Sequence, residues 1–395
     1  MAEKRRDNKG RILRTGESQR KDGRYAYKYT DSTGKPQFVY AWKLVATDKT
    51  PTGKRDDISL REKEAEINRD IADGIDAVGK KMTVCQLYAK QNSQRADVKR
   101  ATKKQREYLM GLLRDDPLGR KSIDAVKPSD AKEWAIRMKE KGFSFQSISN
   151  YKRSLRAAFF IAIEDDCVRK NPFSFALNKV LEDNRGEKTV LTPEQEVSLI
   201  DFAQNDKVYR KYVDELIILL GTGLRISEFC GLTTNLDFKN RLIRVDHQLL
   251  RDPKSGYYIE TPKTKSGYRE IPMSEPVYQA LKRVVKNRGK KTTIMIDGYT
   301  NFLFLKRDGT PKVGMDYNNM IRNLLKKYNK QHKEPLPNIT PHSFRHTFCT
   351  RMANAGMNPK ALQYIMGHAN ITMTLDYYTC LLYTSPSPRD RTRSR

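Results

Sequence analysis

The chain has 395 residues, and its 76 Lys and Arg against 47 Asp and Glu give a formal net charge of +29 at pH 7. One hydrophobic core rarely extends over so long a chain, so we expect two or three domains. The positive charge is spread along the sequence and favours nucleic acid as the partner, although a basic peripheral membrane protein or a ribosome-associated protein would share this composition.

The five cysteines are far apart and include no CxxC pair, which supports neither a disulfide framework nor a zinc site. The start, MAEKRRDNKGRILR, lacks the apolar core of a secretory signal, and no window approaches the roughly 18 apolar residues of a membrane span. These features predict a cytoplasmic protein with reduced thiols.

Residues 1–20 are almost wholly polar and predict a flexible basic arm. The alternating runs RYAYKYTD and PQFVYAWKLVA, separated by a turn that contains Gly34, predict a β-hairpin. Its aromatic stripe is interpreted as core in preference to a base-reading surface: Tyr25, Tyr27, Tyr29, Phe38, Tyr40 and Trp42. The next segment, ISLREKEAEINRDIADGI, predicts a helix with four apolar residues at helical spacing: Leu60, Ala65, Ile67 and Ile71.

Residues 82–184 predict an almost entirely helical domain. Thr83 and Ser129 are the expected N-caps of two helices. In the second of these, four residues are expected on one buried face: Ala131, Trp134, Ala135 and Met138. A longer amphipathic helix, SFQSISNYKRSLRAAFFIAIEDDCV, has an apolar side with Ile148, Leu155, Phe159 and Ile163 and a basic side with Lys152, Arg153 and Arg156. The basic side makes this domain a candidate to face DNA.

A polar segment, EDNRGEKTVLTPEQ, predicts a linker that ends in a helix start with the capping-box spacing of Thr192 and Gln195. A mixed domain then runs to Tyr378. It contains the buried apolar helix YVDELIILLGTGL, the short strands RLIRVDHQLLR, GYYIETPKT and YREIPM, and a terminal set of helices.

Four blocks of this last domain carry residues that suit phosphate chemistry. GTGLRISEFCGL contains Arg225 and Glu228, PKTKSGYREIP contains Lys263 and Lys265, TPHSFRHTF contains His342, Arg345 and His346, and MGHANITMTLDYYT contains His368 and Tyr378. Pro341 opens a helix behind the expected N-cap Thr340, and the three-residue spacing of His342 and Arg345 predicts one helical face near an anion-favouring N-terminus. Each block alone also has an ordinary structural explanation, such as an ion pair or a solvated turn.

In this order the blocks resemble those of the tyrosine recombinase family, which includes the lambda-type phage integrases. The resemblance is close from Thr192 to Thr379 and looser in the helical domain before it. With the N-terminal β-rich module, the chain looks like the integrases of conjugative transposons.

The resemblance implies a multidomain α+β fold. Residues 1–79 would form a basic arm and a β-sheet plus helix module that binds arm sites. Residues 80–184 would form an all-α core-binding clamp, and residues 185–379 a mainly helical catalytic domain with a small antiparallel sheet.

The resemblance also implies a site-specific recombinase that integrates and excises a mobile element through a covalent 3′-phosphotyrosine. A covalent protein–DNA ester conserves the energy of the broken bond, so the reaction needs a nucleophilic side chain. The implied catalytic residues are Tyr378 as nucleophile, Arg225 and Arg345 for the non-bridging oxygens, His342 and His368 as hydrogen-bonding groups, and Lys263, or instead Lys265, as the acid for the leaving oxygen. Glu228 and His346 are expected to support their neighbours.

No metal or other cofactor is expected, because fixed cations supply the charge compensation and no Asp/Glu cluster has metal-ligand spacing. The implied partners are double-stranded DNA with core and arm sites, a homotetramer on that DNA, an excisionase and a host DNA-bending protein, with no membrane. Two other functions share some features: a type IB topoisomerase, and a DNA-binding regulator without enzymatic activity.

Three other tyrosines compete for the nucleophile role: Tyr364, which is expected in the core, Tyr377 and Tyr383. The final segment, CLLYTSPSPRDRTRSR, departs from the family pattern, in which a further helix follows the nucleophile. Its Ser, Pro and Arg content does not favour a continuous helix, and we interpret residues 380–395 as a non-native tail from read-through of a sequencing adaptor or an assembly error. A genuine disordered basic tail is the alternative.

Overall fold

The computed structural model describes residues 5–30, 34–73, 79–95, 98–184, 189–262, 264–288 and 294–382, the last range without the side chains of residues 379–382. The chain divides into two compact units, Met1–Gly186 and Glu187–Arg395. Buried hydrophobic residues form two clusters in the first unit and one in the second. None of the described helices is long and apolar enough to cross a membrane.

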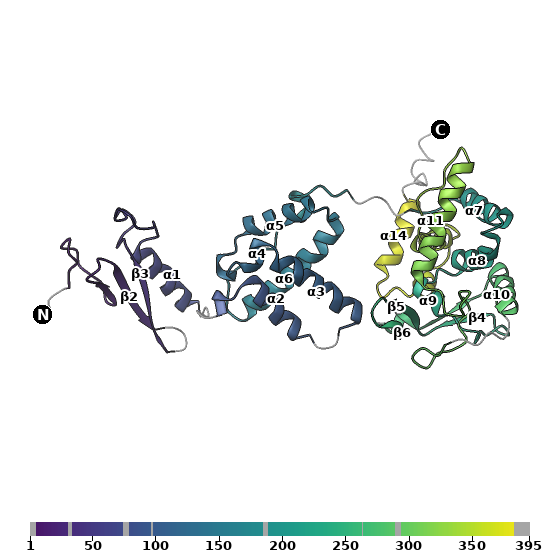
Figure 1. Ribbon diagram of the computed structural model, residues 1–395, viewed down its shortest axis with the longest axis horizontal. Helices are drawn as coiled ribbons and strands as arrows, with labels where there is room; N and C mark the ends of the chain where they lie inside the picture. The colour runs from purple at the N-terminus through teal and green to yellow at the C-terminus, as the bar shows by residue number, and fades with distance from the viewer. Residues whose placement is uncertain are drawn as a thin grey trace, which may run out of the picture. The chain divides into compact units, whose positions relative to one another are not determined.

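The first cluster belongs to a small sheet and one helix. Strands β1 (Glu17–Gln19), β2 (Tyr25–Thr30) and β3 (Pro36–Ala41) form an antiparallel sheet in that order. Tyr25 pairs with Ala41 and Thr30 with Pro36, which confirms the predicted hairpin pairing, while residues 31–33 of its turn lie outside the described residues. Helix α1 (Leu60–Ala72) packs against β2 and β3 (Figure 1).

The prediction of a flexible basic arm is wrong for the described part of residues 1–20. Buried Asp7 accepts hydrogen bonds from the backbone and side chain of Arg11, both at 2.8 Å, and β1 begins at Glu17. Glu17 is fully buried and forms an ion pair of 3.0 Å with Arg61 of α1. Acidic residues therefore hold this basic segment in place, which composition alone does not reveal.

The aromatic stripe is split between the two faces of the sheet. Tyr25 and Tyr27 are buried, as predicted, whereas Phe38 is 54% and Tyr40 37% exposed, so the interpretation of the whole stripe as core is wrong. The cause is the alternation of strand side chains: the single helix of this module covers one face of the sheet only, and β3 presents these rings on the other.

Helix α1 also differs from its predicted burial. Leu60 is fully buried, but Ala65 and Ile71 are exposed, and the acidic residues Glu64 and Asp70 are buried instead. Both acidic groups have cationic neighbours; Asp70, for example, forms an ion pair of 2.6 Å with Lys80. Helical periodicity does not predict the burial of these two carboxylates, and Oε2 of Glu64 is buried without a hydrogen-bond partner among the described residues.

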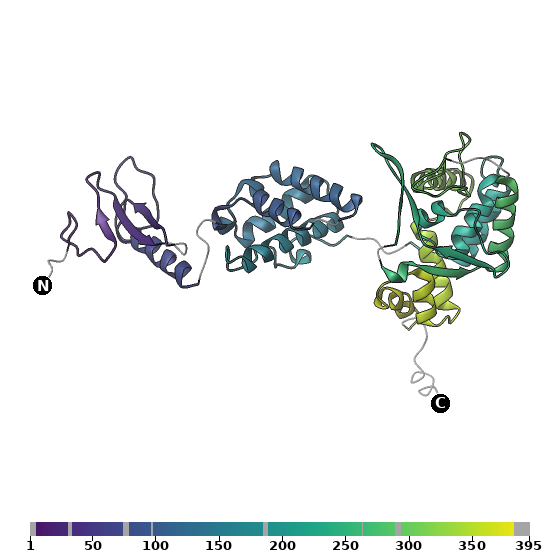
Figure 2. The same ribbon diagram turned by 90° about the horizontal axis from the view of Figure 1, so that it is seen from below.

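The second cluster belongs to a helical domain, as predicted, with α2 (Val84–Ser93), α3 (Arg100–Arg114), α4 (Pro117–Arg120), α5 (Pro128–Glu140) and α6 (Phe145–Glu164) (Figure 2). Short 3-10 turns lie at Gly79–Lys81, Ile123–Ala125 and Leu177–Lys179. Thr83 is the N-cap of α2, as predicted, and it also forms a capping box with Gln86. Ser129 does not cap α5, because Pro128 is already its first residue and Lys127 is the N-cap.

The predicted buried faces of α5 and α6 are largely confirmed. Ala131, Trp134, Ala135 and Met138 of α5 are buried, and so are Ile148, Leu155 and Phe159 of α6, while Ile163 is half-buried. On the basic side of α6, Arg153 and Arg156 are exposed. Lys152 is partly buried, with its Nζ 4.6 Å from the ring centre of Phe175.

The second unit contains α7 (Pro193–Asn205), α8 (Val213–Thr222), α9 (Ile226–Gly231), α10 (Glu275–Arg288), α11 (Gly314–Gln331), α12 (Pro341–Asn354), α13 (Pro359–Met366) and α14 (Thr372–Leu382), with 3-10 turns at Arg210–Tyr212 and Lys265–Gly267. The capping box of Thr192 and Gln195 at α7 is confirmed. Strand β4 (Leu242–Val245) pairs with β7 (Arg269–Pro272), and β5 (Gln248–Asp252) pairs with β6 (Gly256–Glu260). The run predicted as one strand over residues 241–251 is therefore two strands that belong to different ladders.

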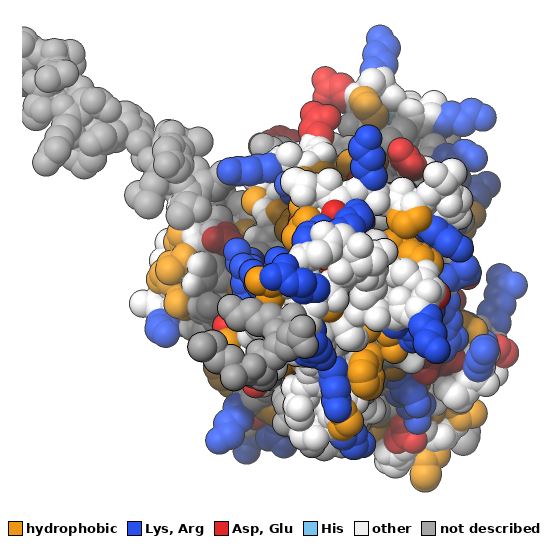
Figure 3. Space-filling model, turned by 90° about the vertical axis from the view of Figure 1, so that its left-hand side faces the viewer, with side chains coloured by type: hydrophobic (Ala, Val, Ile, Leu, Met, Phe, Trp, Pro, Cys, Tyr) orange, Lys and Arg blue, Asp and Glu red, His pale blue; other side chains and the backbone are white. Residues whose placement is uncertain are grey.

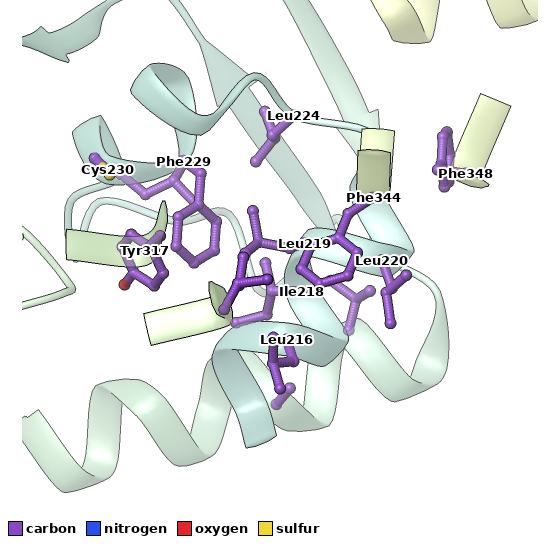
Figure 4. Packing of buried hydrophobic residues seen from close by; sticks show 14 of the residues in the cluster. Leu216, Ile218, Leu219, Leu220, Leu224, Phe229, Cys230, Tyr317, Phe344 and Phe348 are labelled. Carbon is purple, nitrogen blue, oxygen red and sulfur yellow. The ribbon is translucent and has the colours of Figure 1, made fainter. Parts of the chain in front are cut away.

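The apolar helix α8 lies in the core of this unit. Its residues Leu216, Ile218 and Leu219 are buried in one cluster with residues of α9, α11 and α12 (Figure 4). Phe229 of α9 contacts Tyr317 of α11 edge to face, with ring centres 5.3 Å apart. This packing fixes the positions of α9 and α12, the two helices that carry the predicted catalytic arginines.

Candidate active site

Arg225 lies where α8 ends and α9 begins. Helix α8 stops at Thr222, Gly223 takes a left-handed φ of 64°, and Arg225 is the N-cap of α9. A Cβ on Gly223 would lie 2.5 Å from the ring of Phe348, so both the backbone angle and the space require glycine. The side chain of Arg225 is 37% exposed and is accessible to a ligand.

Arg345 of α12 is almost fully buried, at 3% exposure. Its Nη1 donates to the carbonyl of Gly223 at 2.6 Å, and its Nη2 donates to the carbonyl of Met366. Burial and repulsion from Arg225 lower the pKa of Arg345 to about 9, so the group remains charged at pH 7. A fixed cation in a site with little water suits the stabilisation of developing negative charge.

The two histidines of α12 lie side by side. The helix begins at Pro341 with Thr340 as N-cap, as predicted. His342 is exposed, and its ring centre is 4.4 Å from that of His346, one helical turn later. Nδ1 of His346 forms a hydrogen bond with the hydroxyl of Tyr377, so His346 lies at the edge of the site although it points around the helix from Arg345.

His368 is held at the C-terminal end of α13. It follows Gly367, which takes a left-handed φ of 62°, and it is 6% exposed. Its Nδ1 is 2.9 Å from Oγ1 of Thr374. Burial and the charges of Arg345 and Arg225 lower the pKa of His368 to about 4, so the ring is neutral at pH 7 and can donate or accept a hydrogen bond.

Three consecutive carbonyl groups at the end of α13 each accept a hydrogen bond from a different arginine. The pairs are Arg269 Nε with Ile365 at 2.6 Å, Arg345 Nη2 with Met366, and Arg225 Nη2 with Gly367 at 3.0 Å. The last carbonyls of a helix have no partner within the helix and carry its negative end, so cations are favoured there. This helix end gathers guanidinium groups from α9, β7 and α12 beside His368.

Glu228 and Arg269 form a buried ion pair in the same network. Nη2 of Arg269 donates to Oε2 of Glu228 at 2.8 Å, and Nη1 of Arg225 donates to Oε1 at 2.6 Å. Although burial alone would raise it, the pKa of Glu228 falls to about 2 because of the hydrogen bond and charge of Arg269 and the charge of Arg225. No role for Arg269 was predicted from the sequence. Its strand pattern held the signal, since β7 buries both Arg269 and Ile271 on one face.

The lysine-rich turn reaches this network through its backbone. Lys265 is exposed and begins a 3-10 turn that ends at Gly267, whose carbonyl accepts a hydrogen bond of 3.2 Å from Nη1 of Arg269. Lys263, the first choice for the general acid, lies outside the described residues. The structure therefore describes only one of the two candidate lysines.

The tyrosines of α14 differ in their surroundings. Tyr377 is 9% exposed and bonded to His346, and burial raises its pKa to about 12. The hydroxyl of Tyr378 donates to the carbonyl of Met357, and burial, together with Cys349, raises its pKa. The hydroxyl of Tyr378 is thus bonded to a backbone carbonyl, whereas that of Tyr377 is bonded to a histidine of α12.

Two other tyrosines were considered as the nucleophile, Tyr364 and Tyr383. Tyr364 is 52% exposed, so its predicted core position is wrong, although its hydroxyl accepts a hydrogen bond of 3.1 Å from the backbone of Glu270. Tyr383 lies outside the described residues. Helix α14 continues to Leu382, which places residues 380–382 of the suspected tail in a helix.

A second candidate site is the open face of the N-terminal sheet. Phe38 and Tyr40 are exposed there, and guanidinium groups cover the aromatic rings: the Cζ of Arg24 is 5.5 Å from the ring centre of Tyr40 and 5.6 Å from that of Trp42. Nζ of Lys28 is 6.0 Å from the ring centre of Phe38. Exposed rings with adjacent cations can contact both bases and phosphates.

In the part of the chain that the structure describes, no group of three or more His, Cys, Asp or Glu side chains is placed to hold a metal ion. The cations of the candidate active site are side chains of the protein itself.

Comparisons with known proteins agree with this organisation. Residues 189–384 match the phage integrase family, and residues 1–71 match the DNA binding domain of Tn916 integrase. The chain is 67% identical over 386 residues to the transposase from transposon Tn916 of Enterococcus faecalis, and equally to that from transposon Tn1545 of Streptococcus pneumoniae; each alignment covers 98% of this chain and 95% of the relative.

A solved structure of the Tn1549 transposon integrase in complex with a circular intermediate DNA is also similar. It is 60% identical in sequence, with a TM-score of 0.74, and the match covers 79% of this chain and 98% of the integrase. The chain therefore belongs to the phage integrase family of tyrosine recombinases and has an N-terminal DNA-binding domain of the Tn916 integrase type.

Proposed function

We propose that the chain integrates and excises a conjugative transposon by cutting and rejoining DNA through a covalent 3′-phosphotyrosine. The observation that supports this most strongly is the convergence of Arg225 and Arg345 on neighbouring carbonyls at the end of α13, beside the buried neutral His368. A pentacoordinate phosphate develops negative charge on its non-bridging oxygens, and two guanidinium groups can hold those oxygens with geometrically fixed hydrogen bonds.

The proposed cleavage step is a displacement at phosphorus. The phenolic oxygen of Tyr378 forms a bond to phosphorus while the bond from phosphorus to the 5′ oxygen breaks. The phenol proton passes to a base, for which His342 is our candidate, and the 5′ oxygen takes a proton from a lysine of the turn, Lys263 or Lys265. His368 donates a hydrogen bond to a non-bridging oxygen. Rejoining reverses each transfer, so the reaction needs no external energy source.

Tyr378 must change its hydrogen bonding before it reacts, because its hydroxyl is bonded to the Met357 carbonyl. We propose that DNA binding moves α14 or rotates this side chain. Tyr377 is the competing nucleophile, since it already contacts His346. Its pKa of about 12 and its burial oppose ionisation, and its neighbour Tyr378 occupies the family's nucleophile position, ten residues after His368.

Phenylalanine substitutions test this assignment. Nicked suicide duplexes made from the ends of the element that encodes the chain would be incubated with the wild type, Tyr378→Phe and Tyr377→Phe, and covalent protein–DNA products would be separated under denaturing conditions. Tyr378→Phe is expected to form none, whereas Tyr377→Phe is expected to retain trapping. Covalent product from Tyr378→Phe would show that the nucleophile is another residue.

We further propose that cleavage needs no metal ion, because Arg225, Arg345 and the turn lysine supply the compensating charge. Cleavage is expected to proceed at an unchanged rate in EDTA, measured with the same suicide duplexes in single turnover. A strict requirement for Mg²⁺ would contradict this mechanism.

The remaining parts of the chain are proposed to bind DNA at separate sites. Residues 1–79 would bind arm sites through the exposed face of the sheet. Residues 80–184 would bind the core site through the basic side of α6, and the catalytic domain of residues 185–379 would bind the same core site. A homotetramer on DNA, an excisionase and a host DNA-bending protein are the proposed partners. A pair of plasmids with two cognate sites would report recombination directly.

A further inference from the structure

We propose that Arg269 is a positioning residue that holds the backbone of the lysine-rich turn against the end of α13 and so aligns the general acid with the departing 5′ oxygen. This inference rests on the proposed function, in which a lysine of that turn protonates the oxygen. Arg269 itself would touch neither DNA nor the reacting atoms, because its side chain is fully buried.

Each nitrogen of the Arg269 guanidinium group donates at least one hydrogen bond, and together the bonds reach three chain segments. Nε donates to Ile365 O at 2.6 Å, at the end of α13. Nη2 donates to Glu228 Oε2 at 2.8 Å, on α9, and Nη1 donates to Glu228 Oε1 and Gly267 O, both at 3.2 Å. The planar fork of an arginine can make these bonds at the same time, whereas a lysine ammonium cannot reproduce their geometry.

The turn also packs directly on the residue before His368. A Cβ added to Gly367 would lie 3.1 Å from Ser266 O and 3.1 Å from Nη1 of Arg269, so any larger residue would press against the turn and the guanidinium group. Within the turn, the N–H of Gly267 donates to Thr264 O at 2.9 Å. The backbone that carries Lys265 is therefore held against the end of α13, and the lysine side chain is exposed.

The same arginine connects the turn to Arg225. Glu228 accepts hydrogen bonds from both guanidinium groups, so the carboxylate fixes Arg225 relative to Arg269. A buried ion pair carries a desolvation cost that apolar residues of similar volume would avoid, so its retention here calls for a reason other than stability. Alignment of two groups that act on the same phosphate, Arg225 on a non-bridging oxygen and the proton donor on the departing 5′ oxygen, supplies such a reason.

A DNA duplex with sulfur in place of the bridging 5′ oxygen can distinguish alignment of the general acid by Arg269 from a purely structural role of this residue. A thiol has a pKa of about 8.5 and leaves without protonation, so a 5′-bridging phosphorothiolate removes the need for the general acid. Single-turnover cleavage rates would be measured with matched oxygen and sulfur duplexes made from the element's ends, using the full-length chain. The variants would be Arg269→Lys and Gly267→Ala, with Lys263→Ala, Lys265→Ala and Arg225→Lys as controls.

Arg269→Lys is expected to slow cleavage of the oxygen duplex by about 10²-fold or more, the range of a lost general acid, and cleavage of the sulfur duplex by less than about 10-fold. Gly267→Ala should show the same difference without loss of the buried charge, because its Cβ would lie 2.4 Å from Pro262 Cβ and displace the turn. Arg225→Lys should lose activity on both duplexes, since phosphate charge develops with either leaving group. Thermal unfolding and binding of an uncleavable duplex would establish that each variant folds.

The outcomes distinguish the inference from the proposed function. If a lysine variant is rescued by sulfur but Arg269→Lys and Gly267→Ala lose equal activity on both duplexes, Arg269 is only structural and the inference is overturned, while the lysine role stands. If neither lysine variant is rescued, the turn does not carry the general acid, and the proposed lysine role falls together with the inference.

Discussion

Glu228 is the carboxylate that balances two of the guanidinium groups at the active site. It is 6% exposed and accepts hydrogen bonds from Arg225 and Arg269. With a pKa of about 2 it remains ionised at any pH at which the enzyme would work. Arg345 is bonded instead to the backbone carbonyls of Gly223 and Met366, so its charge is left available for a phosphate.

His368 makes the stability of the second unit depend on pH. Its folded pKa of about 4 is below the unfolded value of about 6.5, so between these values the unfolded chain binds a proton that the folded chain does not. Stability is therefore expected to fall by about 2 kcal/mol as the pH decreases from 6.5 to 4. Urea unfolding of the wild type and His368→Asn at both pH values measures the effect.

The difference between the two proteins isolates the histidine, because the carboxylates that also titrate in this range are common to both. An equal loss of stability in His368→Asn would mean that His368 does not titrate as its burial among arginines requires.

Most residues of the candidate active site lie at the ends of helices. Arg225 begins α9, His368 follows α13, and the carbonyls of α13 collect three guanidinium groups. The arrangement depends on Gly367, which both ends the helix in the left-handed conformation and leaves space for the lysine-rich turn.

Gly367→Ala is expected to destabilise the protein by more than a left-handed alanine alone. The backbone strain costs about 1–2 kcal/mol, and the contacts at 3.1 Å with Ser266 and Arg269 add about 1–3 kcal/mol. Gly356→Ala is the matched control, because Gly356 has a φ of 77° but nothing within 4 Å of an added Cβ. Urea unfolding followed by circular dichroism compares the two, and equal losses would contradict the close packing of the turn.

Short-range sequence patterns predicted helix starts and buried helix faces well. The N-cap Thr83, the capping box of Thr192 and the buried residues of α5 were predicted correctly because short-range hydrogen bonds and helical periodicity decide them. Ser129 was misassigned as a cap because the preceding proline already begins the helix.

Over the whole molecule, 76 Lys and Arg against 47 Asp and Glu give an excess of positive charge that suits a DNA partner. Lys and Arg side chains are spread over the face that Figure 3 shows, among uncharged groups and fewer acidic ones. Such charge contributes affinity for any DNA, so the proposed distinction between arm and core sites requires particular surfaces.

Tyr40→Ala is expected to weaken binding of arm-site DNA by about 10-fold, the effect of losing roughly 1.4 kcal/mol of ring contact, and to leave cleavage of a core-site suicide duplex unchanged. Ile71→Ala is the matched control, since Ile71 is 41% exposed but lies on α1, while Tyr40 is 37% exposed on β3. Fluorescence anisotropy with labelled arm-site DNA measures affinity. Equal effects of the two variants would exclude the sheet face as the arm-site surface.

The sign of the charge, the N-terminal hairpin, most helices and the order of the four blocks could be read from the amino-acid sequence, and together these features identified the family. These features depend on local backbone preferences and on residue types that can be read along the chain. The hydrogen bonds of Arg269 to Glu228 and Ile365 could not be read from the sequence. The same holds for the different hydrogen-bond partners of the Tyr377 and Tyr378 hydroxyls. Such contacts join segments far apart in the chain, and only the packing of the core around α8 sets their distances.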